Sequence, residues 1–224
     1  MKPTLKKVIR KVTPFIFLNP EGKKGIEKIG HRKYVGDKWD RLGNLQFDFL
    51  IAQGLTPESF LLDIACGSLR LGVKAIPYLE PLHYLGIEKE SELVKLGLEQ
   101  ELGDTLRAER QPNIVISNSF EFEKLGQKAD FAIAQSLFSH LPSSLINLCF
   151  EKLYPCLKDN GVFYATYFET SEKIDNPKKS HDHGGFFYTQ GEMLDFGTRH
   201  GFSTNYIGNW NHPRNQVMVE YKKN

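Results

Sequence analysis

Cysteine is scarce in this chain, and the three residues that occur, Cys66, Cys149 and Cys156, lack the paired spacing of a zinc site. A disulfide framework needs a denser set of cysteines, so a disulfide-held fold is not expected either. The three thiols are more simply interpreted as small buried side chains. We therefore predict a functional site without a metal ion.

Long hydrophobic runs are also missing. No apolar stretch approaches the roughly 18 residues that a membrane-spanning helix needs, and no signal-peptide pattern with a cleavage site is visible. The composition, 40% hydrophobic and 25% charged, is ordinary for a globular protein and excludes disordered and fibrous classes. The length of 224 residues suits one domain with a small appendage. We expect a cytoplasmic protein.

Negative charge is lacking at the start of the chain. Residues 1–33 contain ten Lys or Arg and two Asp or Glu, whereas residues 34–224 contain nineteen and twenty-five. The body of the protein is therefore mildly acidic, and a nucleic-acid-binding surface would have to come from the basic arm. Nucleic acid is not expected as a partner.

The basic arm has the pattern of an amphipathic helix over residues 4–13. Leu5, Val8, Ile9 and Val12 recur at helical spacing with lysines and arginines between them. Such a helix could bind the surface of an anionic membrane reversibly. The simpler alternative, a short arm that packs on the domain or stays mobile, is favoured.

Residues 19–30 contain three glycines and a proline and are interpreted as a loop that joins the arm to the body. This predicts two parts: an N-terminal arm and loop at residues 1–33, and one globular domain at residues 34–224.

Within the body, strand-like and helical patterns alternate, which predicts an α/β fold. Strands are expected at residues 60–64, 83–87, 113–117, 131–134 and 162–168, and helices at 34–54, 69–79, 89–103, 143–157 and 190–200. Two last strands, 203–207 and 216–221, are joined by too few residues for a crossover helix and must pair antiparallel. The predicted architecture is a Rossmann-like, doubly wound, mostly parallel seven-stranded sheet with an antiparallel C-terminal hairpin.

The stretch LLDIACGSLRLG at residues 61–72 combines a strand, a turn of small residues and a helix start. Small residues let a ligand approach the backbone, and a helix start offers unpaired N–H groups, so this is a candidate nucleotide-binding turn. An ordinary strand-to-helix turn is the alternative. The next strand ends at Glu88, where a carboxylate could accept hydrogen bonds from both ribose hydroxyls. A solvated surface glutamate is the competing interpretation there.

Two further segments could contact the same ligand. Asn118, Ser119 and Phe120 follow the third strand and could supply an apolar face and hydrogen-bonding edges to an adenine ring. The helix at 34–54 could close over the ligand through the polar or aromatic residues Tyr34, Lys38, Trp39 and Gln46. Trp39 is more simply a core residue.

Five βα units ending in an antiparallel hairpin, with a glycine turn and then an acid, resemble the class I S-adenosylmethionine-dependent methyltransferases over roughly residues 56–222. DIACG at 63–67 is similar to the family's Asp/Glu-x-Gly-x-Gly motif, with Ala65 in place of the first glycine. Alanine is tolerable there if its φ is negative. The stretches at 38–55, 67–72 and 209–216 look more like a bacterial subgroup of unassigned acceptor.

The resemblance implies that S-adenosylmethionine is the cofactor. Asp63 and the turn would border its methionine and ribose parts, Glu88 would hold the ribose, and Gln135 would lie beside the sulfonium. Arg70 could reach the cofactor carboxylate, although a structural salt bridge is an equal alternative. The implied cofactor set is Asp63, Ala65, Cys66, Gly67, Ser68, Arg70, Glu88, Asn118, Ser119, Phe120 and Gln135.

A hydroxyl acceptor usually needs a base, and imidazole titrates near neutral pH. His140, after the fourth strand, and His212, on the final hairpin, are the predicted catalytic residues. His183, Trp210 and Arg214 are predicted to contact the acceptor, and Arg214 suits a carboxylate or phosphate. The alternatives are a helix-start histidine bonded to backbone at 140 and a plain exposed turn at 208–215.

The segment QSLFSH at 135–140 lacks an Asn/Asp-Pro-Pro-aromatic sequence, a cysteine and a carboxylate cluster. This argues against amino-methylation of adenine or glutamine, cytosine C5 methylation and Mg²⁺-assisted transfer. The favoured function is methyl transfer to a small-molecule, sugar or lipid-like acceptor, on oxygen. A nicotinamide-dependent oxidoreductase, whose G-x-G-x-x-G is absent at 65–70, and a non-catalytic nucleotide-binding domain are the alternatives. The acceptor and the oligomeric state stay open.

Overall fold

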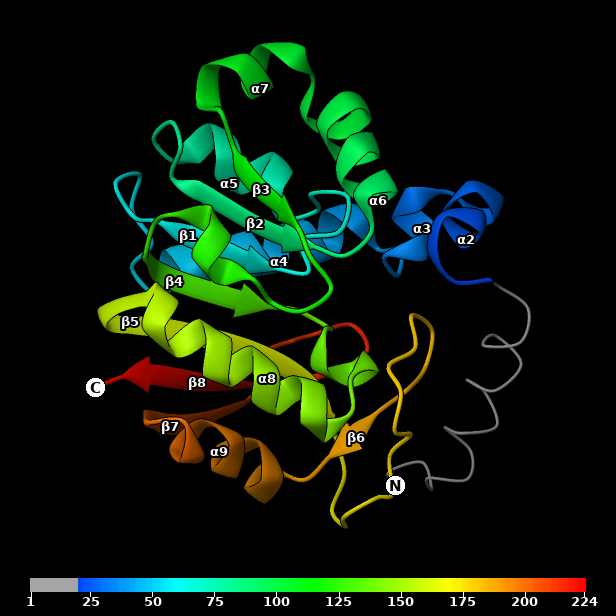
Figure 1. Ribbon diagram of the computed structural model, residues 1–224, viewed down its shortest axis with the longest axis vertical. Coiled ribbons are helices and arrows are strands. Elements are labelled where there is room, and N and C mark those ends of the chain that lie inside the picture. The colour runs from blue at the N-terminus through cyan, green and yellow to red at the C-terminus, as the bar shows by residue number, and fades with distance from the viewer. Residues whose placement is uncertain (1–19) are drawn as a thin grey trace.

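The computed structural model describes residues 20–224, and the basic helix expected at 4–13 lies outside the described residues. A single twisted sheet runs through the molecule in the strand order β3-β2-β1-β4-β5-β8-β7 (Figure 1). Its strands are β1 (Leu61–Ile64), β2 (Tyr84–Glu88), β3 (Asn113–Ile116), β4 (Ala129–Ala134), β5 (Leu157–Glu169), β7 (Phe202–Asn209) and β8 (Val217–Lys223).

The first five strands are parallel to their neighbours, and β8 pairs antiparallel with both β5 and β7. The mostly parallel sheet with an antiparallel C-terminal hairpin is thus confirmed. An eighth strand, β6 (Phe187–Tyr188), was not predicted; it pairs in parallel with the carboxyl end of β5. Two residues are too short a segment for an alternating pattern to be recognised.

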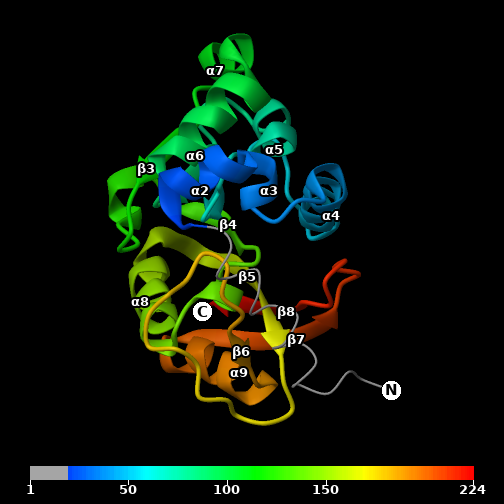
Figure 2. The same cartoon turned by 90° about the vertical axis from the view of Figure 1, so that its right-hand side faces the viewer.

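Helices cover both faces of the sheet (Figures 1 and 2). They are α2 (Gly22–Ile29), α3 (His31–Tyr34), α4 (Trp39–Ala52), α5 (Gly72–Tyr78), α6 (Ser91–Leu96), the π-helical turn η1 (Gly97–Leu102), α7 (Asp104–Arg110), α8 (Ser143–Leu153) and α9 (Gln190–Arg199). Short 3-10 turns occupy Phe122–Leu125, Phe138–His140 and Tyr154–Cys156. Within residues 20–224, no helix is both long and apolar enough to cross a bilayer.

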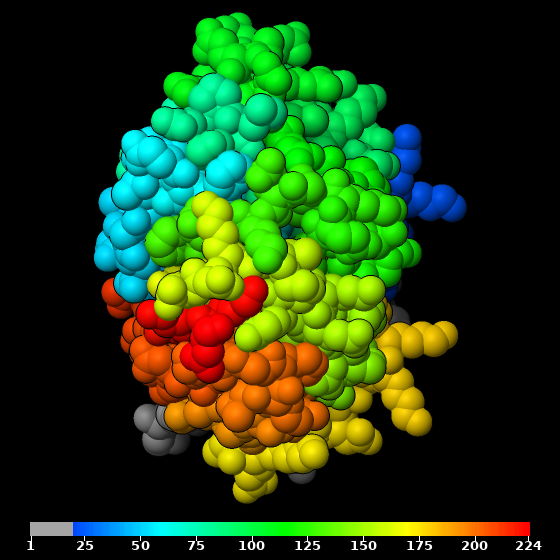
Figure 3. All heavy atoms as spheres, turned by 60° about the vertical axis from the view of Figure 1, so that its left-hand side comes forward, coloured from blue at the N-terminus to red at the C-terminus, as the bar shows by residue number. Residues whose placement is uncertain are grey.

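Two hydrophobic cores lie on opposite faces of the sheet. Successive strand residues alternate between them: Leu61 and Tyr164 face the core beneath α4 and α5, whereas Leu62 and Phe163 face the core beneath α8 and α9. This is the period-two geometry of a strand buried on both faces. On the left-hand side of Figure 1, which comes forward in Figure 3, the C-terminal residues lie beside the start of β5, where Lys223 donates to the carbonyl of Leu157 at 2.9 Å.

Residues 22–29 form a helix, and the prediction of a loop there is wrong. The glycines that suggested a loop have a packing reason, because a Cβ on Gly25 would lie 1.8 Å from the carbonyl oxygen of Pro20. Ile26 is buried and packs with Tyr34 and with Leu93 of α6. The segment that precedes the expected domain boundary therefore covers the sheet through α6.

The predicted helix at 34–54 is interrupted. Gly36, Asp37 and Lys38 have φ values of 98°, 57° and 53°, and three consecutive left-handed residues separate α3 from α4. Similarly, α5 begins at Gly72 rather than at Leu69, whose φ is 67°.

Two glycines of α9 give a matched test of the packing between this helix and the sheet. A Cβ on Gly197 would lie 2.3 Å from the Tyr221 ring, whereas a Cβ on Gly191 meets nothing within 4 Å. We expect Gly197→Ala to lower the free energy of unfolding by about 1–3 kcal/mol through overpacking. Gly191→Ala should leave it unchanged or raise it by up to about 1 kcal/mol. Urea denaturation measures both, and equal stabilities would contradict the close approach.

Candidate functional site

A cavity of about 1210 Å³ lies at the carboxyl ends of the parallel strands. Its wall includes residues that directly follow or end β1, β2, β3, β4 and β5, which is where ligands bind in open α/β sheets. The helices α2 and α3 and the loop at 180–185 border the same cavity.

Most of the predicted site residues meet at this cavity. The predicted residues that lie on its wall are Ala65, Cys66, Gly67, Arg70, Glu88, Asn118, Phe120, Gln135, His140, His183 and Arg214. The wall does not include Asp63, Ser68, Ser119, Trp210 or His212. Tyr34 also lines the cavity, whereas Lys38, Trp39 and Gln46 do not.

The turn after β1 has a left-handed backbone. Ala65 has a φ of 60° and Gly67 a φ of 57°. The condition under which alanine is tolerable at this position, a negative φ, is therefore not met. The left-handed conformation of Ala65 costs a non-glycine residue about 1–2 kcal/mol. A Cβ on Gly67 would lie 3.0 Å from the Val35 side chain, so this position needs glycine for both reasons.

The Glu88 carboxylate fixes this turn. It accepts hydrogen bonds from the backbone N–H groups of Gly67 at 2.9 Å, Lys89 at 2.8 Å and Glu90 at 3.0 Å. Burial raises the pKa of Glu88, and the three N–H donors partly offset this rise. The surface-glutamate alternative fails, because only 6% of the residue is exposed. A fixed carboxylate on a cavity wall is able to accept hydrogen bonds from neighbouring hydroxyls.

Asp63 has a different environment from the one predicted. It is buried and accepts a hydrogen bond from the Tyr84 hydroxyl at 2.8 Å. Burial raises the pKa of Asp63 to about 6, against the opposing effects of Tyr84 and Arg70.

Arg70 and Gln135 join the first and fourth strand ends. The guanidinium of Arg70 donates to the Gln135 side-chain oxygen at 2.5 Å and to the Val35 carbonyl at 2.9 Å. Burial lowers the pKa of Arg70 to about 10, and its Nε has no hydrogen-bond partner. The Asp63 carboxylate partly offsets this lowering of the Arg70 pKa. Within residues 20–224, however, Arg70 forms no ion pair. The structural salt bridge considered for this arginine is absent from that part of the chain.

His140 ends the 3-10 turn after β4 and lies on the cavity wall. Its Nδ1 is buried without a hydrogen-bond partner. Burial lowers the pKa of His140 to about 4, which the Asp182 carboxylate and the backbone of Gly184 and His181 partly offset. The ring is therefore neutral at pH 7 and can accept a proton. The interactions of the ring with the backbone of Gly184 and His181 fit the alternative of a histidine bonded to backbone.

His212 is placed behind Gln135. Its Nε2 accepts from the Gln135 amide nitrogen at 3.0 Å, and its ring stacks on Trp210 with centroids 5.5 Å apart. Burial and the nearby charges of Arg214 and Arg70 lower the pKa of His212 to about 3. In this position His212 orients the Gln135 amide.

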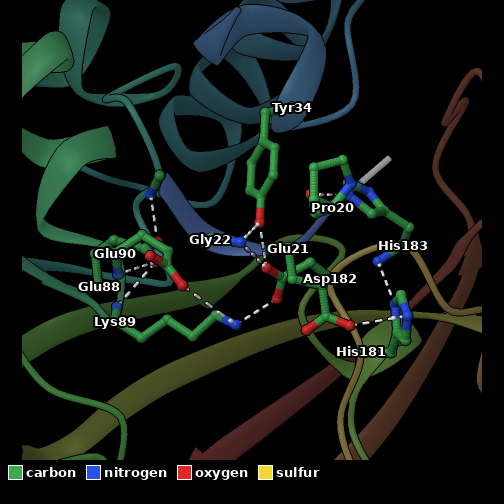
Figure 4. A network of polar contacts seen from close by, with 11 residues as sticks. Pro20, Glu21, Gly22, Tyr34, Glu88, Lys89, Glu90, His181, Asp182 and His183 are labelled. Atoms are coloured by element: carbon green, nitrogen blue, oxygen red, sulfur yellow. Dashed lines mark hydrogen bonds and ion pairs between the residues drawn. The ribbon is translucent and has the colours of Figure 1, made fainter. Parts of the chain in front are cut away.

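A network that the sequence did not indicate connects α2, α3, β2 and the loop at 180–185 (Figure 4). The Asp182 carboxylate accepts hydrogen bonds from the Tyr34 hydroxyl and the Lys89 ammonium, and the Gly22 N–H lies 3.3 Å from it. Beside it, His181 contacts Glu21 at 2.8 Å. The polar loop was noticed in the sequence, but nothing local marks its partners, which lie up to 160 positions away. In the described part of the chain, no group of His, Cys, Asp or Glu is arranged to hold a metal ion.

Comparison with known proteins gives one family match and many structural ones. Residues 62–163 match the family model described as a methyltransferase domain, and no curated protein matches the chain. Magnesium protoporphyrin IX methyltransferase from Synechocystis PCC 6803, with bound S-adenosylmethionine, has a TM-score of 0.65 and 17% identity over 98% of this chain and 97% of that chain.

Two other similar structures are described as methyltransferases of different kinds. An O-methyltransferase family protein from Burkholderia thailandensis has a TM-score of 0.65 and 9% identity, over 97% of this chain and 70% of that chain. An amino pentose methyltransferase from Micromonospora echinaspora has a TM-score of 0.61 and 13% identity, over 86% of this chain and 94% of that chain. At these identities the likeness establishes the fold alone.

The Asp182 network predicts a pH-dependent contribution to stability. Burial raises the pKa of Asp182, but the bonds from Lys89 and Tyr34 outweigh it and leave the pKa below its ordinary value. A carboxylate with a lower pKa in the folded state contributes stability above its unfolded pKa, about 3.9, and loses it as the pH falls through the folded pKa. We expect Asp182→Asn to lower the free energy of unfolding by about 1–3 kcal/mol at pH 7 and by less at pH 3.

Urea unfolding at the two pH values measures this difference. Asp175→Asn is the control, because Asp175 is exposed in the same loop. A deficit of the Asp182 variant that is as large at pH 3 as at pH 7 would show that its charge does not contribute.

Proposed function

Because the chain carries a methyltransferase domain in the class I fold and is an S-adenosylmethionine-dependent methyltransferase, we propose that it methylates an oxygen atom of a small-molecule acceptor. The observation that carries this proposal is the buried ring of His140 on the cavity wall, directly after β4, with its Nδ1 unpartnered. The description of the Burkholderia protein as an O-methyltransferase supports the choice of oxygen.

The residues on the wall fit the proposed cofactor. Glu88 would hold the ribose hydroxyls, and Asn118 and Phe120 would frame adenine on the side of β3. Arg70 is a buried cation without an ion pair in the described residues and with an unpartnered Nε, so the cofactor's carboxylate would complete its environment. Ala65, Cys66 and Gly67 lie on the cavity wall and would border the methionine part.

S-adenosylmethionine supplies a methyl group that is already activated as a sulfonium. The chain must then position the acceptor for an in-line displacement and remove its proton. His140 accepts that proton through Nε2. His183 and Arg214 contact the acceptor from the loop at 180–185 and the β7–β8 turn. His212, predicted as a catalytic residue, would instead position Gln135 through its hydrogen bond, and Trp210, predicted to contact the acceptor, would support His212 by stacking on its ring.

Isothermal titration calorimetry with S-adenosylmethionine, S-adenosylhomocysteine and NAD tests the cofactor. We expect the first two to bind and NAD not to bind. Glu88→Gln should weaken the binding of S-adenosylhomocysteine about 10- to 100-fold, because a neutral amide replaces a charged acceptor of two hydroxyl bonds. Glu80→Gln, whose side chain is 53% exposed, is the control. Unchanged affinity in the Glu88 variant removes this residue from the ribose role, and binding of NAD alone contradicts the proposed activity.

The proposed base must be unprotonated near neutral pH. We expect the His140 C2 proton to titrate near pH 4, because burial disfavours the imidazolium. Histidine NMR spectra recorded between pH 3 and pH 8, with His140→Gln to assign the resonance, measure this pKa. A midpoint near the ordinary value of about 6.5 would show that the ring is solvated rather than buried.

A further inference from the structure

One side of the cavity has a wall of apolar side chains. Phe168 at the end of β5 pairs with Phe187 of β6, and their rings lie 5.5 Å apart with an interplanar angle of 30°. Both rings are half-buried and line the cavity. Leu137, Leu141 and Leu145 continue this surface beside His140. We call these five side chains the apolar wall.

The phenylalanine pair of the apolar wall lies apart from the proposed cofactor residues that follow β1, β2 and β3. The cofactor residues at 65–67, Glu88 and Asn118 follow β1, β2 and β3, whereas Phe168 ends β5, which is two strands from β1 in the sheet. At about 4.8 Å per strand, this separates the two groups by about 10 Å. The cavity of about 1210 Å³ exceeds the usual range of single ligand sites, about 300–1,000 Å³, and so has room for two ligands.

Few polar groups near the wall are available to a ligand. Asp182 already accepts from Tyr34 and Lys89, and His181 is bonded to Glu21 and to the N–H of His183. A sugar would bring several hydroxyls that each need a partner when they leave water. An acceptor with an apolar body and one hydroxyl directed at His140 meets no such cost.

The strength of the base separates two kinds of hydroxyl. A base whose conjugate acid has a pKa of about 4 is weak. A phenol has a pKa of about 10, like the tyrosine side chain, whereas an aliphatic hydroxyl resembles water at about 16. Proton transfer to a weak base is less unfavourable from a phenol.

We propose that the acceptor is a hydroxyaryl compound whose flat apolar ring system packs on Phe168 and Phe187 while its hydroxyl faces His140. This rests on the proposed function. In the reaction, the O–C bond forms as the S–C bond of the sulfonium breaks, and the phenolic proton passes to Nε2 of His140. The products are an aryl methyl ether and S-adenosylhomocysteine, and His140 then releases the proton to solvent.

Three probes test the acceptor class. They are 2-naphthol, its saturated counterpart decahydro-2-naphthol, which keeps the apolar body but has an aliphatic hydroxyl, and glucose, which has neither an apolar body nor a phenolic hydroxyl. Binding is measured by calorimetry with protein saturated with S-adenosylhomocysteine, and transfer from S-adenosylmethionine by mass spectrometry of the methyl ether. We expect 2-naphthol to bind and to be methylated. Decahydro-2-naphthol should bind within about tenfold without being methylated, and glucose should do neither.

Variants locate the site. Phe168→Ala and Phe187→Ala should each weaken 2-naphthol binding about tenfold and leave the affinity for S-adenosylhomocysteine unchanged. Phe187→Leu is the milder change in case the alanine variants do not fold. His140→Gln should bind 2-naphthol within about threefold of wild type and lose at least about 100-fold in transfer rate. Leu82→Ala, at a residue that is 53% exposed, is the surface control.

The outcomes separate the two proposals. Failure of the wild-type protein to bind S-adenosylhomocysteine overturns the proposed function. If that ligand binds, then absence of 2-naphthol binding, methylation of glucose or decahydro-2-naphthol in its place, or 2-naphthol binding that is unchanged in the phenylalanine variants overturns the hydroxyaryl acceptor.

Discussion

The buried carboxylate of Glu88 accepts hydrogen bonds from three backbone N–H groups. The shape of the cavity wall at the ends of β1 and β2 depends on these bonds. The bond from Gly67 ties the turn after β1 to the end of β2, and the N–H of Cys66 donates to the Ile87 carbonyl at 3.1 Å beside it. These bonds hold Ala65 in a conformation that alanine otherwise avoids. An ion that is desolvated in this way is tolerated because its lone pairs are already directed at fixed donors.

A second polar network joins the turn after β1 to the end of β4 and to the turn of the C-terminal hairpin. Gln135 accepts from Arg70 and Gln46 and donates to His212, so one amide connects the end of β4 with three other elements. Each of these groups is costly to bury alone, and each is satisfied mainly by the others. The wall residues therefore have little freedom to reorient, which suits a site that must hold two reactants in line.

Much of this fold could be predicted from the sequence, because it depends on local patterns. The strands and the C-terminal hairpin follow from hydrophobic periodicity and from the short link between β7 and β8, and Glu88 follows from its place at a strand end. The residues that differ depend on distant partners. A Cβ on Gly25 would meet the ring of Tyr34, His212 accepts a hydrogen bond from Gln135, and Asp182 bonds residues from two other elements. The pairs Gln135 with His212 and Asp182 with Tyr34 are too far apart for any short window of sequence to contain both members.

The Asp182 network also constrains the order in which the chain can fold. Its bonds to Gly22 and Tyr34 join residues 160 and 148 positions apart. The entropy of closing so long a loop is recovered only after the intervening sheet has formed, because the sheet brings the two segments together. The helices α2 and α3 leave the ribosome before the sheet does, yet their contacts with the loop at 180–185 are among the last that the chain can complete.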